Sequence, residues 1–169
     1  MSISMYKASV PVFKQMLTSL SAILNKAKTH VETNKIASEE LLQATLFSNM
    51  FNLTRQVQIA ADFAKGVSAR LAGVEVPSYE DSETSFDELQ TRISKTLTFI
   101  GSLAPLQMDG SEEREIITQA GTPKEKKFVG QSYLLHYGLP HFFFHVTTAY
   151  DILRSKGVEI GKRDYIGTY

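Results

Sequence analysis

The stretch Gly130–Gly157, GQSYLLHYGLPHFFFHVTTAYDILRSKG, decides the fold of this chain. Its apolar residues recur at alternating spacings of four and three, which is the period of one face of an α-helix. That stripe consists of Leu135, Leu139, Phe142, Val146, Ala149 and Leu153. Phe143 and Phe144 make the middle of the helix apolar on nearly every side. The stretch therefore predicts one long central helix, buried by its neighbours and by a second copy of the chain.

Two histidines lie one turn apart near the middle of this helix, just after Pro140. Pro140 has no N–H to donate, so we expect a kink ahead of the pair. On a wheel of about 100° per residue, His145 points largely inward and His141 lies on the flank. A catalytic zinc-type site normally takes three protein ligands, and the pair supplies two.

Three further helices are predicted before this stretch. The first runs from about Ser9 to Thr33 and the second from about Asn52 to Leu71. The third begins at Ser85, where Ser85-Phe-Asp-Glu88 matches a capping box, and is closed by Gly101 and Pro105. A short helical piece is expected after Ser38, which reads as its N-cap. Each long segment carries an apolar seam at spacings of three and four, so each buries one face.

The segment between the third and fourth helices has a different pattern. Glu115–Thr118 and Lys126–Val129 flank the turn Gly121-Thr-Pro123, which predicts a small β-hairpin packed on the helices. Four amphipathic helices with short to medium connections then predict an all-α fold. We expect an antiparallel four-helix bundle with this hairpin between helices 3 and 4, forming a single domain over residues 1–169.

The composition excludes several classes of partner and chemistry. Lys plus Arg equals Asp plus Glu at 18 each, so we expect no nucleic-acid partner. The absence of cysteine excludes disulfides and thiolate catalysis. No apolar run approaches the roughly 20 residues that span a bilayer, and no signal peptide is visible, so we expect no membrane partner. The expected location is the cytoplasm.

Three segments carry a resemblance to a known family. SMYKASVPVF near the start, FNLTRQVQIAADFAKG in the second helix and FFFHVTTAYDILRSKGVEIGKRDYIG near the end resemble a bacterial and fungal family of unknown function. That family belongs to the DinB/YfiT-like superfamily, which is described as a group of candidate metalloenzymes. The resemblance implies a four-helix bundle, frequent homodimerisation through helices and no settled activity.

The resemblance also implies a metal site made of one histidine in the second helix and an i, i+4 pair in the fourth. His141 and His145 match the pair, but the second helix contains no histidine. Asp62 is the carboxylate available there at mid-height, and two histidines with one aspartate suit zinc, nickel or iron. The alternative is that His145 is a hydrogen-bonded core residue and His141 a pocket or interface residue.

Other polar side chains are weaker candidates. Arg55 either binds an anion or pairs with Asp62, and we favour the pairing. Tyr6, like Tyr133 and Tyr137, either lines a cavity or caps an edge of the core. The pocket candidates are Tyr6, Arg55, Gln58, Asp62, His141 and His145.

Two functions remain open from the sequence. The first is a dimeric small-molecule-binding or structural protein that lacks a complete three-histidine metal site and binds no cofactor. The alternative is a divalent-metal-dependent hydrolase or thiol transferase that uses His141 and His145 as ligands. The sequence does not decide whether the chain is an enzyme.

Overall fold

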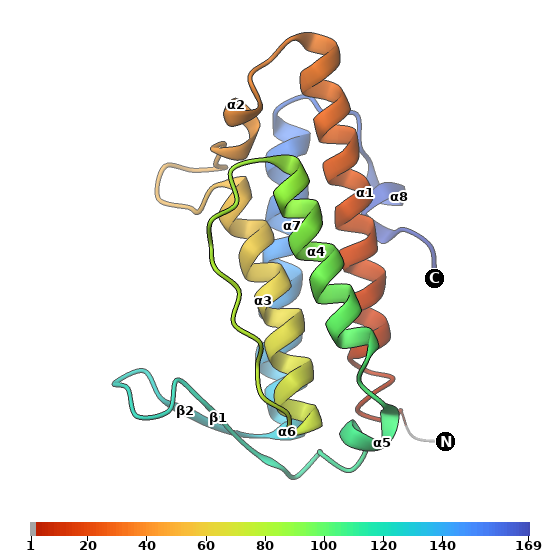
Figure 1. Cartoon of the computed structure of the whole chain (residues 1–169), viewed down its shortest axis with the longest axis vertical. Helices are drawn as coiled ribbons and strands as arrows, with labels where there is room; N and C mark the ends of the chain where they lie inside the picture. The colour runs from red at the N-terminus through yellow and green to blue at the C-terminus, as the bar shows by residue number, and fades with distance from the viewer. Residues whose placement is uncertain (1–2) are drawn as a thin grey trace.

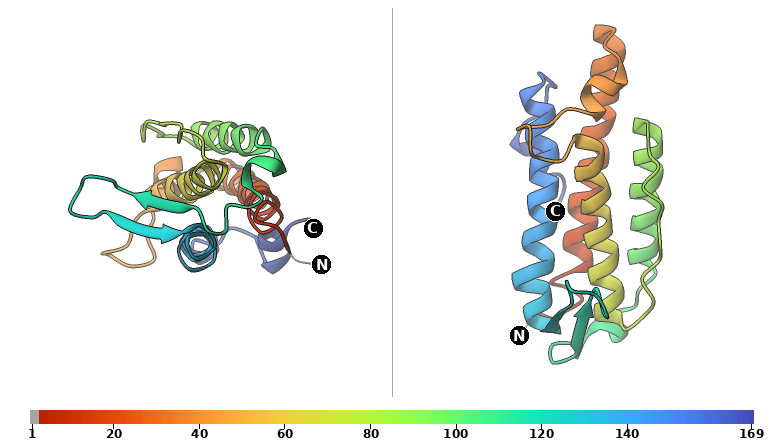
Figure 2. Two further views of the ribbon diagram at one scale, coloured as in Figure 1. Left: turned by 90° about the horizontal axis from the view of Figure 1, so that it is seen from below. Right: turned by 90° about the vertical axis from the view of Figure 1, so that its left-hand side faces the viewer.

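The computed structural model describes residues 3–169 and is mostly helical, with one two-stranded antiparallel sheet (Figure 1). Its long helices are α1 (Val10–Asn34), α3 (Leu53–Ala72), α4 (Phe86–Gly101) and α7 (Leu139–Ser155). They lie side by side, with α3 in contact with both α4 and α7 (Figures 1 and 2). Within the described residues, none of the helices is long and apolar enough to cross a membrane.

Several shorter helices qualify the prediction of four helices. They are α2 (Ser38–Leu42), α5 (Pro105–Met108), α6 (Gly130–Ser132) and α8 (Lys162–Ile166). Each is too short to carry a full apolar stripe. Of the four, α2 was expected as a separate short helix, and α6 lies within the predicted central helix. The last of them lies along α1, where the side-chain amide of Gln15 donates to the Ile166 carbonyl at 2.9 Å.

The starts of two long helices follow their predicted caps. The Asn52 side chain accepts a hydrogen bond from the Arg55 N–H at 2.9 Å, and Ser85 and Glu88 form the predicted capping box. The predicted N-cap of α2 is wrong by one residue. Ala37 takes the extended cap conformation there, and Ser38 is the first helical residue without a side-chain cap bond.

The predicted hairpin is confirmed. Strands β1 (Glu115–Thr118) and β2 (Lys126–Val129) pair antiparallel, with Ile116 opposite Phe128. The hairpin lies at the end of the helices where α6 begins (Figures 1 and 2). Gly130 follows β2 directly, and a Cβ there would fall 1.9 Å from the Ser111 carbonyl oxygen. The chain can therefore turn from strand into helix here only with glycine.

The predicted central helix is continuous along the chain but changes its helix type. Between α6 and α7, the residues Tyr133–Gly138 form a π-helix, η1, immediately ahead of Pro140. The wider turns of a π-helix rotate the preceding residues relative to those that follow. Phe142, Val146, Ala149 and Leu153 are buried as predicted, but Leu135 is 43% exposed. Tyr133 and Leu134 take the buried positions instead.

Candidate functional site

The histidine pair on α7 faces α3. His145 is 8% exposed, and its Nδ1 lies 2.7 Å from Gln56 Oε1. The amide nitrogen of Gln56 donates to the Phe51 carbonyl at 3.1 Å, which orients the amide. With its amide oxygen towards the ring, Gln56 accepts from His145 Nδ1–H. Neutral His145 therefore carries its proton on Nδ1 and keeps the lone pair on Nε2.

Aromatic rings of α3 and η1, here called the ring ladder, pack against the pair. Tyr137 and His141, one turn apart, have ring centroids 4.6 Å apart. Phe63 of α3 stacks on His141 at 4.7 Å with the planes 8° apart, and its ring is 6.1 Å from that of His145. Aromatic rings thus replace water around the buried His145, whereas His141 stacks on Phe63 but stays exposed. Burial, followed by the neighbouring His141 and Arg55, lowers the pKa of His145 to about 4. Burial and Lys126 also lower the pKa of His141.

These shifts predict that acid weakens the fold. An unfolded histidine titrates near a pKa of about 6.5, whereas folded His145 has a pKa of about 4. Between these values the unfolded chain binds more protons, so stability is complete above about pH 6.5 and falls as the pH drops towards about 4. The slope is at most about 1.4 kcal/mol per pH unit. Urea unfolding at about pH 7, 6 and 5 gives the free energy of unfolding at each pH. This free energy should change less with pH in His145→Gln than in the unmodified chain. An equal pH dependence of the two free energies would show that the pKa of His145 is not lowered in the folded protein.

No third acidic, histidine or cysteine ligand joins the pair in the described part of the chain, where no three such side chains are grouped to hold a metal ion. Asp62 instead forms ion pairs with Lys65 and Arg92, each at 2.9 Å. The side chain of α3 that shares a hydrogen bond with His145 is Gln56. The site therefore consists of two neutral imidazoles, one of them oriented by an amide.

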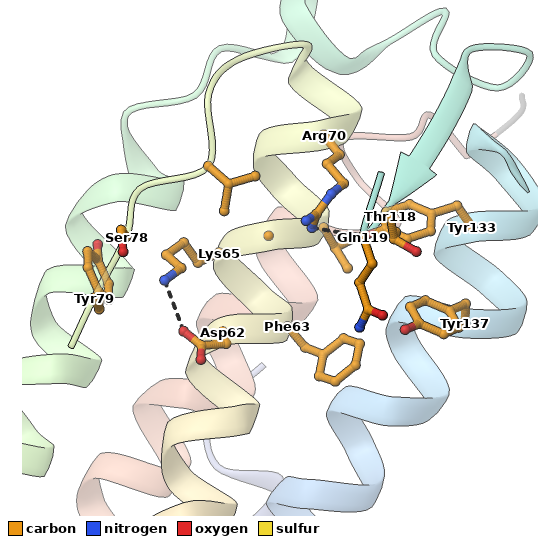
Figure 3. A pocket seen from close by; sticks show the side chains of 13 residues that line it. Asp62, Phe63, Lys65, Arg70, Ser78, Tyr79, Thr118, Gln119, Tyr133 and Tyr137 are labelled. Atoms are coloured by element: carbon orange, nitrogen blue, oxygen red, sulfur yellow. Dashed lines mark hydrogen bonds and ion pairs between the residues drawn. The ribbon is translucent and has the colours of Figure 1, made fainter. Parts of the chain in front are cut away.

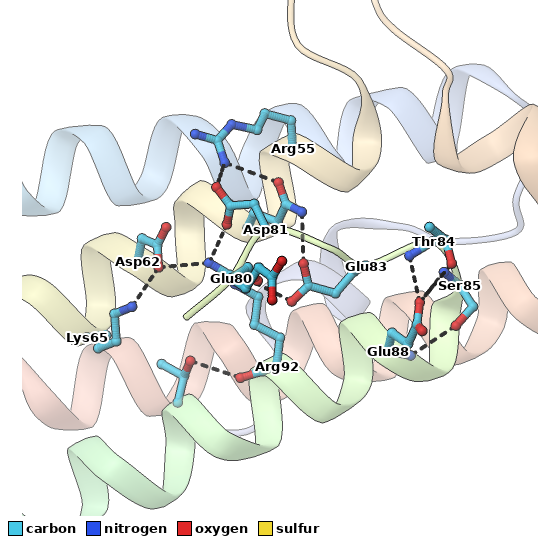
Figure 4. Close-up of polar contacts among 12 residues, drawn as sticks. Arg55, Asp62, Lys65, Glu80, Asp81, Glu83, Thr84, Ser85, Glu88 and Arg92 are labelled. Atoms are coloured by element: carbon cyan, nitrogen blue, oxygen red, sulfur yellow. Dashed lines mark hydrogen bonds and ion pairs between the residues drawn. The ribbon is translucent and has the colours of Figure 1, made fainter. Parts of the chain in front are cut away.

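The predicted pairing of Arg55 with Asp62 is wrong. Arg55 forms its ion pair with Asp81 and donates to Gln58 Oε1 at 3.2 Å. The side-chain amide of Gln58 donates to Glu83 at 2.8 Å. The connection of residues 74–84, here called the strap, runs back along the helices and brings these two acids to α3 (Figure 4). Spacing along a single helix could not reveal partners that arrive from a connection.

Arg92 of α4 anchors the strap. Its side chain is 1% exposed and forms ion pairs of 2.9 Å with Asp62, Asp81 and Glu83 (Figure 4). It also donates to the Glu80 carbonyl at 3.1 Å. One guanidinium thus joins α3, α4 and the strap.

Tyr6 lies apart from the other predicted pocket residues. Its backbone N–H donates to Asp109 Oδ1 at 3.1 Å, and its ring lines a hollow that it shares with Lys14 and Tyr169. The structure therefore brings together His141 and His145, and separately Arg55 with Gln58. It places Asp62 with the cations of α3 and α4 and leaves Tyr6 beside the C-terminal tail.

A pocket that the sequence did not predict lies between α3, η1, the strap and the end of β1 (Figure 3). Its volume is about 300 Å³. Side chains that line it include Phe63, Arg70, Tyr79, Gln119, Tyr133 and Tyr137. Phe63 and Tyr137 also belong to the ring ladder of the histidine pair, so the pocket adjoins that pair. Tyr133 and Tyr137 were cavity candidates from the sequence. The spacing of Gly66 and Arg70, one turn apart, was the missed signal.

Comparison with known proteins gives a family and a structural relative. The model of the family described as "Domain of unknown function (DUF1993)" matches residues 5–166. The crystal structure of a DinB family member protein from Shewanella denitrificans is similar, with a TM-score of 0.90 and 38% sequence identity. That match covers 97% of this chain and 92% of the other. No curated protein matches the chain.

Proposed function

We propose that this chain, which belongs to the family described as "Domain of unknown function (DUF1993)" within the DinB-like superfamily, binds a small molecule. We also propose that it is built on a four-helix bundle. The ligand occupies the pocket between α3 and η1. The observation that carries this proposal is a hollow of about 300 Å³ lined by aromatic rings and a few polar groups. Pockets of about this size and character are typical of small-ligand sites.

The pocket also has walls of fixed shape, which favours binding. Gly138 of η1 packs so closely on α3 that a Cβ there would fall 2.7 Å from Val67 Cγ2. The strap wall is held by the ion pairs of Arg92. A preformed site spends less free energy on ordering when its ligand arrives.

The experiment is a screen of small neutral, anionic and cationic aromatic compounds by ligand-observed NMR and calorimetry. We expect at least one class to bind at millimolar concentration or below. Tyr137→Ala, which removes one wall of the pocket, should weaken that binding at least tenfold while leaving the circular dichroism spectrum unchanged. If no compound binds, or if Tyr137→Ala has no effect on those that do, the pocket is not the binding site.

A second candidate function is divalent-metal binding at His141 and His145. The observation that favours it is the hydrogen bond from His145 Nδ1–H to Gln56, because it leaves Nε2 free as a ligand nitrogen. The imidazole of His141 lies one turn away on the same face. Together they would hold zinc, nickel or iron, with water in the remaining positions.

Metal content tests this candidate directly. Protein purified without a histidine tag should contain about one equivalent of metal, and the His141→Ala, His145→Ala double variant should contain none. Gln56→Leu should weaken metal affinity on the order of 10-fold or more, because the ring loses the partner that orients it. Metal-free protein that takes up no zinc, nickel or iron on dialysis would exclude the candidate.

We also propose that the chain forms a homodimer through its helices. Phe144 of α7 and Leu135 of η1 are exposed large apolar side chains, and exposed apolar groups favour a protein partner. Sedimentation velocity should show a dimer at micromolar concentration, and Phe144→Ser should shift the equilibrium towards monomer. A monomer at every concentration would contradict the proposal.

A further inference from the structure

The position of Arg70 on α3 depends on a glycine. Arg70 and Gly66 are one turn apart on α3, and the Arg70 side chain folds back over the helix. A Cβ on Gly66 would fall 2.7 Å from Arg70 Nη1. The guanidinium therefore occupies space that any other residue at position 66 would fill. Both residues line the pocket between α3 and η1.

Arg70 differs from the other cation of the pocket in its charge balance. Lys65 forms an ion pair with Asp62 at 2.9 Å and lies over the Tyr79 ring at 3.9 Å. Asp62 is bound by Arg92 as well. Among residues 3–169, no carboxylate lies within ion-pair distance of Arg70. Its fork of N–H donors matches the two oxygens of a carboxylate.

A second donor points to the same place. Tyr133 is buried, and its hydroxyl oxygen accepts a hydrogen bond from Arg70 Nη1 at 3.2 Å. The hydroxyl hydrogen remains available for an anion. Burial, only partly offset by Arg70, raises the pKa of Tyr133, so the hydroxyl stays protonated at neutral pH. Figure 3 shows Arg70, Tyr133 and the Gln119 amide around the same part of the pocket.

Gln119 has a strained backbone conformation. It follows β1 with φ of 52°, the left-handed region that glycine occupies more easily. In this conformation its side chain lies between Arg70 and Tyr137 (Figure 3). A strained non-glycine residue that lines a pocket is a feature typical of binding sites.

The rest of the pocket is suited to a flat apolar group. The Phe63 and Tyr137 ring centroids are 5.8 Å apart, and those of Tyr133 and Tyr137 are 5.7 Å apart. Aromatic rings pack favourably on one another at such offsets. A volume of about 300 Å³ limits the ligand to a single ring with small substituents.

We propose that this pocket binds a small aromatic carboxylate, with its carboxylate on Arg70 and Tyr133 and its ring against Phe63 and Tyr137. The proposal rests on the proposed small-molecule function and names its ligand class. Gly66 acts through Arg70: it is the residue that allows the guanidinium to lie in the pocket.

Calorimetry with benzoate and with its neutral isostere benzamide tests the proposal. Benzoate should bind at least tenfold more tightly than benzamide. Arg70→Gln should abolish this preference. Gly66→Ala should also weaken benzoate binding at least tenfold, since the new methyl group displaces the guanidinium without removing its charge. Lys65→Gln is the matched control, because Lys65 lines the same pocket but is already paired.

Gly66→Ala also separates a binding role of Arg70 from a structural one. Alanine favours the interior of a helix over glycine, and the displaced group is the flexible end of a side chain. The melting temperature of Gly66→Ala should therefore stay unchanged or rise while benzoate affinity falls. Gln119→Gly should likewise keep or raise the melting temperature, because glycine adopts the left-handed backbone without strain. It should also lower benzoate affinity, because it removes the amide from the pocket.

The outcomes distinguish the two levels of the proposal. If benzamide binds as tightly as benzoate and Arg70→Gln changes neither affinity, the carboxylate proposal is overturned while the pocket remains a small-molecule site. If neither compound binds and the wider aromatic screen is also negative, both proposals fail. If Lys65→Gln weakens benzoate binding as much as Arg70→Gln, the recognition is general electrostatic attraction and the Arg70 assignment is overturned.

Discussion

Arg92→Met is expected to lower the free energy of unfolding by about 3 kcal/mol, a loss typical of removing one partner of a buried ion pair. Arg92 is almost fully buried, and three carboxylates converge on its guanidinium at 2.9 Å. Methionine would fill much of the same volume without charge. Asp62, Asp81 and Glu83 would then repel one another, with Lys65 left to pair with Asp62 and Arg55 with Asp81. The free energy lost is therefore electrostatic rather than a packing defect.

The matched control is Arg55→Met. Arg55 shares the partner Asp81 but its side chain is 38% exposed, so its ion pair is screened by water. The expected loss is below about 1 kcal/mol, as for surface pairs in general. Urea unfolding followed by circular dichroism measures both variants.

The same substitution should release the strap. Arg92 contacts three residues of the strap, Glu80, Asp81 and Glu83, whereas Arg55 and Gln58 each bind one. We expect limited proteolysis within residues 74–84 to become much faster in Arg92→Met and to stay slow in Arg55→Met. A loss of stability below about 1 kcal/mol in Arg92→Met would mean that the cost of burying the guanidinium nearly equals the gain from its ion pairs.

The features that the sequence predicted well are local ones. The Asn52 cap, the Ser85–Glu88 box and the hairpin each depend on residues within a few positions of one another. The apolar seams were predictable for the same reason, since helical period is a local property. The histidine pair was visible for the same reason, because an i, i+4 pair is a local pattern.

The features that the sequence did not predict depend on distant segments. Nothing near Arg55 or Asp62 in the chain indicates that Asp81 and Arg92 are their partners. The pocket around Arg70 joins α3, the strap, the hairpin and η1, four segments whose approach is a result of the whole fold. The π-helix at Tyr133–Gly138 also changed which residues of the central stretch are buried, because its extra residue per turn breaks the period of 3.6.

Phe142→Ala is expected to lower the free energy of unfolding by about 4 kcal/mol, within the range of about 3–5 measured for buried phenylalanines. Phe142 follows Pro140 and His141 on α7 and is 0% exposed. Its ring meets that of Phe13 on α1 edge to face, with centroids 4.8 Å apart and planes at 82°. Alanine would leave a cavity between α1 and α7 that long helices, fixed by their other contacts, cannot close.

The chain offers a matched control in Phe47→Ala. Phe47 is 65% exposed in the connection between α2 and α3, so losing its ring should change the free energy of unfolding by no more than about 0.5 kcal/mol. Phe142→Leu should lose less than about 1.5 kcal/mol, because leucine keeps most of the volume. Urea unfolding of all three variants gives the comparison. If Phe142→Ala costs no more than Phe142→Leu, the helices move together to fill the space, and the central stretch tolerates repacking that its burial does not suggest.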